Sequence, residues 1–151
     1  METINPIPSQ YERPQIACCY SSLLFVTNVI VAYNYGYYLY SALFAAMTIT
    51  SIIHHSTKSF TTYWIDKIIV FAVVGYGGYI LFDKIAKGNV REYQLLYYPI
   101  IVGAFLGTIV LYYYGRLHKC FCFAEDLDEC DRWHQLLHLI SSIGHHVIVI
   151  L

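Results

Sequence analysis

Residues 95–114 read LLYYPIIVGAFLGTIVLYYY, a run of 20 residues without a charged side chain. A transmembrane helix needs about 20 mostly apolar residues, because each residue adds only ~1.5 Å of rise across a hydrocarbon core ~30 Å thick. The tyrosines near both ends of the run fit the aromatic belts found where a membrane meets water. This stretch therefore predicts a membrane-spanning helix.

The composition of the whole chain points the same way. Of its 151 residues, 58% are hydrophobic and 13% are charged, whereas a soluble domain carries roughly 25% charged residues. The mean hydropathy is +0.50. The formal net charge of −1 gives no reason to expect a nucleic-acid partner, and the length predicts one domain.

Five stretches of the chain are long and apolar enough to be interpreted as spans. They lie near 16–34, 37–56, 64–82, 95–114 and 133–151, and a polar segment at 1–15 precedes them. The first stretch lacks a basic flank and a clear cleavage site, so we expect it to be retained rather than removed as a signal peptide. The longest polar loop, 115–132, contains the acidic run 125–129. The sequence thus predicts an all-α, multi-pass bundle of about five transmembrane helices.

The order of the spans determines which of their ends share a side of the membrane. We name the side of the N-terminus side B and the opposite side A. The end of the second span and the starts of the third and fifth all fall on side B. Polar residues mark these three ends: Ser51 and His55, then Asp66, then His134 and His138. Ionisable groups inside a bilayer are costly and usually serve a function, so these residues are candidates for a site.

The distribution of basic residues predicts an orientation. Six lie near side B, and they are Arg13, Lys58, Lys67, Arg116, Lys119 and Arg132. Three lie near side A, and they are Lys84, Lys87 and Arg91. Cytoplasmic loops carry an excess of Lys and Arg, so side B is predicted to face the cytosol.

The histidines have the spacing that a metal ion needs. His134 and His138 are four residues apart, so they share one helix face about 6 Å apart at Cβ. With His55 they make three imidazoles, and catalytic zinc sites combine three protein ligands with one open position. Asp66 could accept a proton there and Ser51 could donate a hydrogen bond. The pattern therefore predicts a zinc site with His55, His134 and His138 as ligands.

Plainer interpretations exist for each of these residues. His134 and His138 could simply be solvated at the headgroup level. Ser51 could bond to its own helix backbone. Asp66 could pair with Lys67 or Lys58 at the interface instead of taking part in chemistry.

The residues Ser51-x-x-x-His55, Asp66 and His134-x-x-x-His138 resemble the signature of the CREST superfamily of membrane proteins. This superfamily includes alkaline ceramidases, progestin and adipoQ receptors, and hemolysin-III-like proteins. Trp133 and the segment 139–144 (LISSIG) are most similar to the ceramidase branch. The resemblance covers about 51–82 and 133–144. It implies that the three histidines bind zinc, that Ser51 and Asp66 lie beside the water that zinc activates, and that the substrate is a ceramide-like lipid amide.

The chain departs from that family in three ways. Family members usually have seven helices, so a five-helix chain looks shortened by two helices between its fourth and last spans, a loss that keeps the ligands on one side. The acidic calcium-binding segment of alkaline ceramidases is not recognisable before the first span. Lys67 follows the key Asp66, where the family leads us to expect no charge.

These features together predict an integral-membrane, zinc-dependent hydrolase that acts on a lipid amide or ester. Its partners would be the bilayer and a sphingolipid-like substrate. Gly103 and Gly107 form a Gly-x-x-x-Gly pair that could join two copies. A non-catalytic zinc-containing receptor, sensor or accessory protein is the alternative. A small channel or transporter that uses His54, His55 and His145 as a polar path is a third.

Other histidines and the cysteines have more than one interpretation. His54 is the alternative ligand if the helix register differs, His145 is expected to satisfy a hydrogen bond in the bundle, and His146 is expected at the interface. The five cysteines do not form a disulfide framework. Cys18 and Cys19 are expected to be inert core residues. Four residues of the polar loop could form a Cys/His zinc clip, although Cys-x-Cys matches the usual spacing poorly and unliganded thiols are favoured; they are His118, Cys120, Cys122 and Cys130.

Overall fold

The computed structural model describes residues 13–88 and 92–151, and every regular element within them is helical. The chain begins with α1 (Ile16–Ser22), α2 (Phe25–Asn34), α3 (Tyr38–Thr57) and α4 (Phe60–Ala86). It continues through η2 (Glu92–Leu96), α5 (Tyr97–Ile109), the π-helical η3 (Val110–Tyr114) and α6 (Gly115–His118). The last elements are η4 (Phe121–Phe123) and α7 (Leu127–Ile150). The predicted all-α fold is confirmed, while most of the polar segment predicted at 1–15 falls outside the described residues.

Three helical stretches are long and apolar enough to cross a membrane. They are Ile16–Asn34, Phe60–Ala86 and Gln94–Phe123, which correspond to the first, third and fourth predicted spans. The other two predicted spans are the helices α3 and α7, of 20 and 24 residues, which are not among the three. Their histidines, serines and threonines lower the mean hydropathy of these two helices. The structure thus supports a membrane protein with three such stretches.

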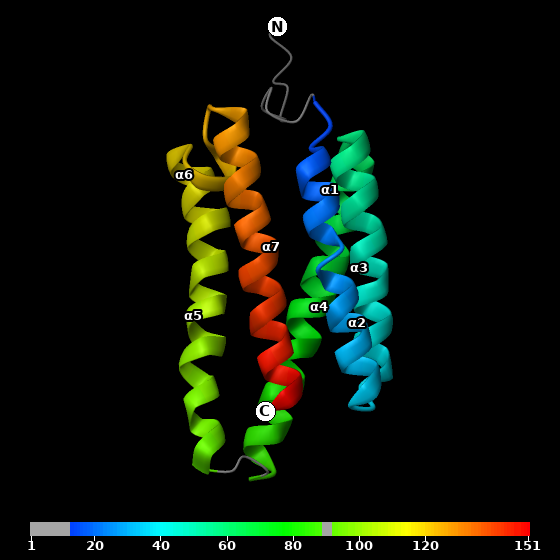
Figure 1. The fold of residues 1–151 in the computed structure, drawn as a ribbon, viewed down its shortest axis with the longest axis vertical. Helices are drawn as coiled ribbons and strands as arrows, with labels where there is room; N and C mark the ends of the chain where they lie inside the picture. Colours follow the sequence, from blue (N-terminus) through cyan, green and yellow to red (C-terminus); the bar gives the residue numbers. More distant parts are fainter. Residues whose placement is uncertain (1–12, 89–91) are drawn as a thin grey trace, which may run out of the picture.

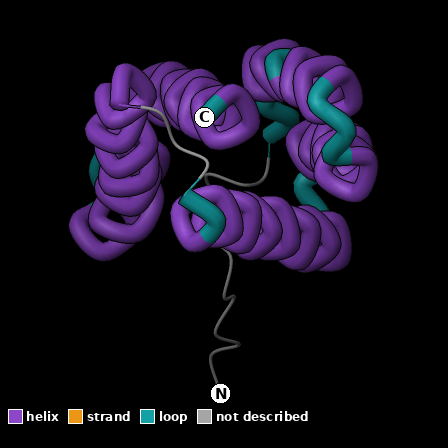
Figure 2. The backbone as a smooth tube through the Cα atoms, turned by 90° about the horizontal axis from the view of Figure 1, so that it is seen from below, coloured by secondary structure: helices purple, strands orange, loops and turns teal. Residues whose placement is uncertain are grey.

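The helices stand side by side in an elongated bundle (Figure 1), and Figure 2 shows them nearly end-on. The backbone N–H of Gln15 donates to the carbonyl of His55 at 2.8 Å, so the start of α1 lies beside the end of α3. In Figure 1, α6 and the first turns of α7 lie at this same end, and the C-terminus lies toward the opposite one. The ends that the sequence grouped on side B therefore meet at one end of the bundle.

Local capping decides where α4 and α7 begin. Lys58 ends α3 in the left-handed region at φ 51°, and the Ser59 side chain accepts a hydrogen bond from the N–H of Thr62 at 3.1 Å, which caps α4. Asp126 Oδ1 accepts from the N–H groups of Asp128 and Glu129, both at 2.9 Å, which caps α7.

These caps shift two predicted helix starts, and α4 also ends later than predicted. The helix α4 spans Phe60–Ala86 rather than 64–82, and α7 begins at Leu127 rather than 133. The loop predicted at 115–132 is therefore largely helical, since it contains α6, η4 and the first turns of α7. Hydropathy does not reveal such helix starts because their first turns are polar.

The first predicted span is divided at Leu23 and Leu24. Their N–H groups donate to carbonyls three residues back, those of Tyr20 and Ser21, both at 3.1 Å, instead of four residues back. This tighter turn separates α1 from α2 and is visible as the break between them in Figure 1. Both halves lie against α7, so one membrane-length segment contacts α7 along two differently placed helices.

Small residues set the spacing of α5 and α7. A Cβ placed on Gly144 of α7 would lie 2.7 Å from the Cβ of Ala104, so the two helices approach closely there. A Cβ on Gly107 would lie 3.6 Å from Ile140 of α7, whereas one on Gly103 would meet nothing within 4 Å. Gly107 therefore packs inside the chain. The homo-oligomer contact predicted through Gly103 and Gly107 stays a prediction, with only Gly103 facing open space.

Candidate metal centre

Three histidines from two helices converge at the side B end of the bundle. His55 lies in the last turn of α3, while His134 and His138 lie one turn apart on α7. One nitrogen from each ring can be chosen so that all three lie within 4.8 Å of one another. Among the described residues, this is the group of His, Cys, Asp or Glu side chains spaced to hold a metal ion.

The three rings face one another at steep angles. Ring centroids are 4.8 Å apart for His55 and His134, 5.4 Å for His55 and His138, and 4.9 Å for His134 and His138. Tetrahedral ligands at ~2.0–2.1 Å from zinc stand about 3.4 Å apart. The 4.8 Å limit is therefore wider than a closed zinc site, and it also exceeds the ~4 Å that the zinc interpretation of the sequence implies. The limit exceeds the closed zinc site by about 1.4 Å, which ring rotation on metal binding would have to close.

Two predicted residues from α3 and α4 form a buried pair. Ser51 Oγ donates to Asp66 Oδ1 at 2.6 Å, and the side chains are 3% exposed in both residues. Thr50 Oγ1 lies 3.4 Å from the same oxygen, and the Lys67 ammonium lies 3.5 Å from Asp66 Oδ2. The predicted Asp66–Lys67 ion pair is thus present together with the Ser51 bond. Ser51 lies one turn before His55, so the carboxylate is held next to the histidine cluster.

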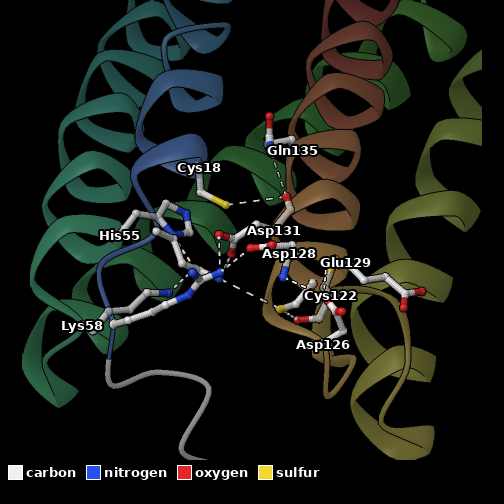
Figure 3. Close-up of polar contacts among 12 residues, drawn as sticks. Cys18, His55, Lys58, Cys122, Asp126, Asp128, Glu129, Asp131 and Gln135 are labelled. Atoms are coloured by element: carbon white, nitrogen blue, oxygen red, sulfur yellow. Dashed lines mark hydrogen bonds and ion pairs between the residues drawn. The ribbon is translucent and has the colours of Figure 1, made fainter.

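The start of α1 supplies further polar contacts. Gln15 is 5% exposed; its Oε1 accepts from His55 Nδ1 at 3.1 Å and from the Lys58 ammonium, and its Nε2 donates to Asp131 Oδ1 at 2.6 Å. Figure 3 shows His55 and Lys58 on one side of this cluster and Asp131 on the other. Burial lowers the pKa of Lys58 from 10.5 to about 8, so the ammonium stays protonated at neutral pH.

His138 has a comparable partner one turn and a half along α1. Its Nδ1 lies 2.7 Å from Ser21 Oγ, and Phe25 packs on the ring with centroids 5.2 Å apart. Both His55 and His138 thus use Nδ1 for a hydrogen bond within the protein. Their Nε2 atoms are left for another partner.

The remaining histidines lie outside the cluster. His54 is buried, and its Nδ1 has no hydrogen-bond partner among the described residues. Its ring packs on Tyr63 with centroids 5.6 Å apart, and His54 is not part of the histidine group. His145 Nδ1 bonds the Tyr40 hydroxyl at 2.5 Å, in agreement with the predicted hydrogen bond inside the bundle. His146 Nδ1 lies 2.9 Å from Asn28 Nδ2 of α2. Its place at the membrane interface stays a prediction.

The cysteines of the predicted loop 115–132 do not form a metal-binding group within the described residues. All five cysteines are free thiols. The Cys130 thiol donates to the carbonyl of Cys122 at 2.9 Å, and His118 stacks on Tyr114 with centroids 4.1 Å apart. The interpretation as unliganded thiols stays a prediction.

The contacts of Gln15 with His55 and of Ser21 with His138 were not predicted from the sequence. Ser21 stands in the first predicted span with Ser22 and Asn28, and polar residues inside a predicted span are a signal for partners in the bundle. Gln15 lies just before the predicted span, where no hydropathy pattern distinguishes it from the preceding polar residues.

Comparisons with protein-family models, with curated proteins and with solved structures found no match to this chain. The interpretation of the site therefore depends on its own residues and geometry.

Proposed function

We propose that this chain is an integral-membrane, zinc-dependent hydrolase that cleaves an amide or ester bond in a lipid. The observation that supports it best is the convergence of His55, His134 and His138 beside the buried Ser51–Asp66 pair. The resemblance of these five residues to the CREST signature, and to its ceramidase branch, supports the same reaction. In this proposal all five predicted helices cross the membrane, and side B faces the cytosol.

The donor set suits zinc. Imidazole nitrogens are common zinc ligands, and three of them leave a fourth position open, as catalytic sites require. The three imidazoles can bind a cation as neutral ligands, and the nearby Asp66 carboxylate would offset part of its charge. A bound zinc ion would polarise the substrate carbonyl and lower the pKa of a water molecule to about 7.

The side chains around the triad have distinct tasks in the proposed reaction. Asp66 accepts the proton that the attacking water loses and passes it to the leaving amine or alcohol. Ser51 occupies Asp66 Oδ1 through its hydrogen bond, so Oδ2 is the atom that takes the proton. The Lys67 ammonium lies 3.5 Å from Oδ2 and forms an ion pair with the carboxylate. The lipid tails would lie along the apolar helix faces, with the scissile bond at the end of the bundle.

Metal content is the first test. Protein purified in mild detergent should contain close to one zinc per chain at neutral pH, and His134→Ala and His138→Ala should lose it. His118→Ala is the matched control, because this histidine stacks on Tyr114 away from the triad. A wild-type protein without zinc at neutral pH would overturn the proposal.

Activity is the second test. A zinc-loaded sample should hydrolyse a ceramide, another lipid amide or a lipid ester, and Asp66→Asn should keep its zinc while losing at least 100-fold in turnover. If Asp66→Asn retains both zinc and full turnover, Asp66 is not the proton acceptor. If the zinc-loaded wild type cleaves no lipid amide or ester, the non-catalytic receptor or sensor is the better interpretation.

A further inference from the structure

Helix α1 contacts two of the three proposed zinc ligands. Gln15, at its N-terminal end, bonds His55 Nδ1 at 3.1 Å, and Ser21, in its last turn, bonds His138 Nδ1 at 2.7 Å. Neither contact belongs to the residue set that suggested the hydrolase. Both contacts use Nδ1, and they leave Nε2 of each histidine to face the metal ion.

The orientation of the Gln15 amide is fixed by its other partners. Asp131 carries a carboxylate that only accepts, and it lies 2.6 Å from Gln15 Nε2. Lys58 carries an ammonium that only donates, and it contacts Gln15 Oε1. Turning the amide over would set an acceptor against Asp131 and donors against Lys58. Gln15 Oε1 is therefore an acceptor toward His55, so His55 Nδ1 carries the proton and Nε2 keeps its lone pair.

Ser21 selects the same state in His138. Its hydroxyl can donate to the carbonyl of Cys18 at 3.1 Å, and in that arrangement the Ser21 oxygen accepts from His138 Nδ1 at 2.7 Å. The neutral imidazole of His138 then also keeps its lone pair on Nε2. A metal ion needs such a lone pair, and the hydrogen bond at the other nitrogen decides which one is available.

We propose that Gln15 and Ser21 of α1 are positioning residues of the metal site, which hold His55 and His138 in the tautomer and orientation that present Nε2 to the ion. This inference depends on the proposed zinc site and adds a third helix to it. It also gives a reason for the buried contacts of Gln15, since the amide joins α1, α3 and α7 at the point where the ligands meet. Partners of this kind typically change metal affinity about 10- to 100-fold when removed.

The structure offers a matched control for each residue. Ser22 is the neighbour of Ser21 and bonds the same Cys18 carbonyl at 2.8 Å, but it does not contact a histidine of the triad. Gln135 donates to the backbone carbonyl of Asp131 at 3.2 Å, so it resembles Gln15 in type and partner without touching His55. Ser22→Ala and Gln135→Met therefore remove similar bonds away from the ligands.

The experiment measures zinc affinity by chelator competition in detergent and the visible spectrum of the cobalt-loaded protein. Gln15→Met and Ser21→Ala should each bind zinc about 10- to 100-fold more weakly and change the cobalt spectrum. Ser22→Ala and Gln135→Met should behave like the wild type, and Ser21→Thr, which keeps the hydroxyl, should restore affinity. In metal-free protein labelled with 15N-histidine, NMR should place the proton of His138 on Nδ1 in the wild type and show mixed tautomers in Ser21→Ala.

The outcomes separate this inference from the proposed function. A wild type that binds no zinc would overturn both. A wild type that binds zinc, with unchanged affinity and unchanged tautomers in Gln15→Met and Ser21→Ala, would leave the zinc site in place and overturn the positioning role. If Gln15→Met does not fold, Ser21→Ala with its Ser22→Ala and Ser21→Thr partners still decides the question, because it removes one hydroxyl only.

Discussion

Ser51 Oγ donates a 2.6 Å hydrogen bond to Asp66 Oδ1, and this bond joins the last turns of α3 to the second turn of α4. The two residues are separated by 15 positions and by a turn that contains Lys58 and Ser59. A buried carboxylate needs such donors, because burying a charge without them is costly. The bond also fixes which carboxylate oxygen is left for chemistry.

Loss of the Ser51 hydroxyl should therefore weaken catalysis without removing the metal. We expect Ser51→Ala to keep its zinc and lose about 10- to 100-fold in turnover, since an unheld carboxylate is misplaced for proton transfer. Thr50→Ala is the control, because Thr50 Oγ1 lies farther from the same oxygen, at 3.4 Å, and also bonds its own helix at the carbonyl of Met47. Equal turnover of the two variants in a lipid hydrolysis assay would count against the role of Ser51.

A second polar contact lies deeper, between α2 and α7. Asn28 is 2% exposed; its Oδ1 accepts from Ser142 Oγ at 2.6 Å, and its Nδ2 donates to the Ser142 carbonyl at 3.0 Å. His146 Nδ1 lies 2.9 Å from the same Nδ2. Asn28 thus satisfies several polar groups in an otherwise apolar interface.

Removing Asn28 should destabilise the bundle rather than the metal site. Asn28→Ala leaves the Ser142 hydroxyl without its acceptor, and we expect a loss of about 1–2 kcal/mol of unfolding free energy, the range for such bonds in proteins and membranes. Reversible unfolding in mixed detergent measures it. Thr27→Ala is the neighbouring control, since Thr27 is exposed and bonds only the carbonyl of Leu24. Equal stability of the two variants would show that the contact contributes little.

The sequence could predict the helices and the grouping of the histidines, because both follow from segment length and order. The apolar runs mark the middle of each helix, and the order of the spans places His55 and His134 at the same end. The starts of α4 and α7 could not be predicted because Ser59 and Asp126 act through only one and two hydrogen bonds to the backbone, respectively. Such bonds leave no trace in hydropathy.

The surroundings of the site were harder to predict for a different reason. Gln15 and Ser21 matter because of where α1 lies against α3 and α7, and a single sequence does not specify that packing. The contact of His146 with Asn28 could not be predicted for the same reason, since the two residues are 118 positions apart. Contacts between residues so far apart in the sequence depend on how each helix is rotated about its axis. The number and order of the spans do not determine this rotation.

Helices α3, α4 and α7 come close together at Gly77, and we expect no room for a side chain at this position. A Cβ there would overlap the Tyr40 hydroxyl and lie 3.1 Å from His145 Nδ1, and Tyr40 is fully buried. We expect Gly77→Ala to cost about 1–3 kcal/mol of unfolding free energy.

One position away, the same change is expected to be harmless. A Cβ on Gly78 meets nothing within 4 Å, and Ala is the better helix former, so Gly78→Ala should leave the stability unchanged or raise it slightly. Adding Tyr40→Phe to Gly77→Ala should recover part of the loss, because the hydroxyl is the nearest obstacle. No recovery in detergent unfolding would indicate that His145 or the Tyr40 ring, rather than the Tyr40 hydroxyl, limits the space.

The cap of α7 predicts a pH dependence of stability. Hydrogen bonds from the N–H groups of Glu129 and Asp128 lower the pKa of Asp126 below its ordinary value of 3.8. A carboxylate with a lower pKa in the folded state stabilises the fold above its unfolded pKa, and this contribution is lost as the pH falls through the lower folded value. Stability should therefore decline more steeply below about pH 4 in the wild type than in Asp126→Asn, which keeps the capping oxygen without the charge. Thermal unfolding from pH 3 to pH 6 measures this dependence. The control is Glu125→Gln, which removes a neighbouring charge outside the cap and should retain the wild-type slope. Identical slopes for the wild type and Asp126→Asn would mean that another acid controls the stability in this pH range.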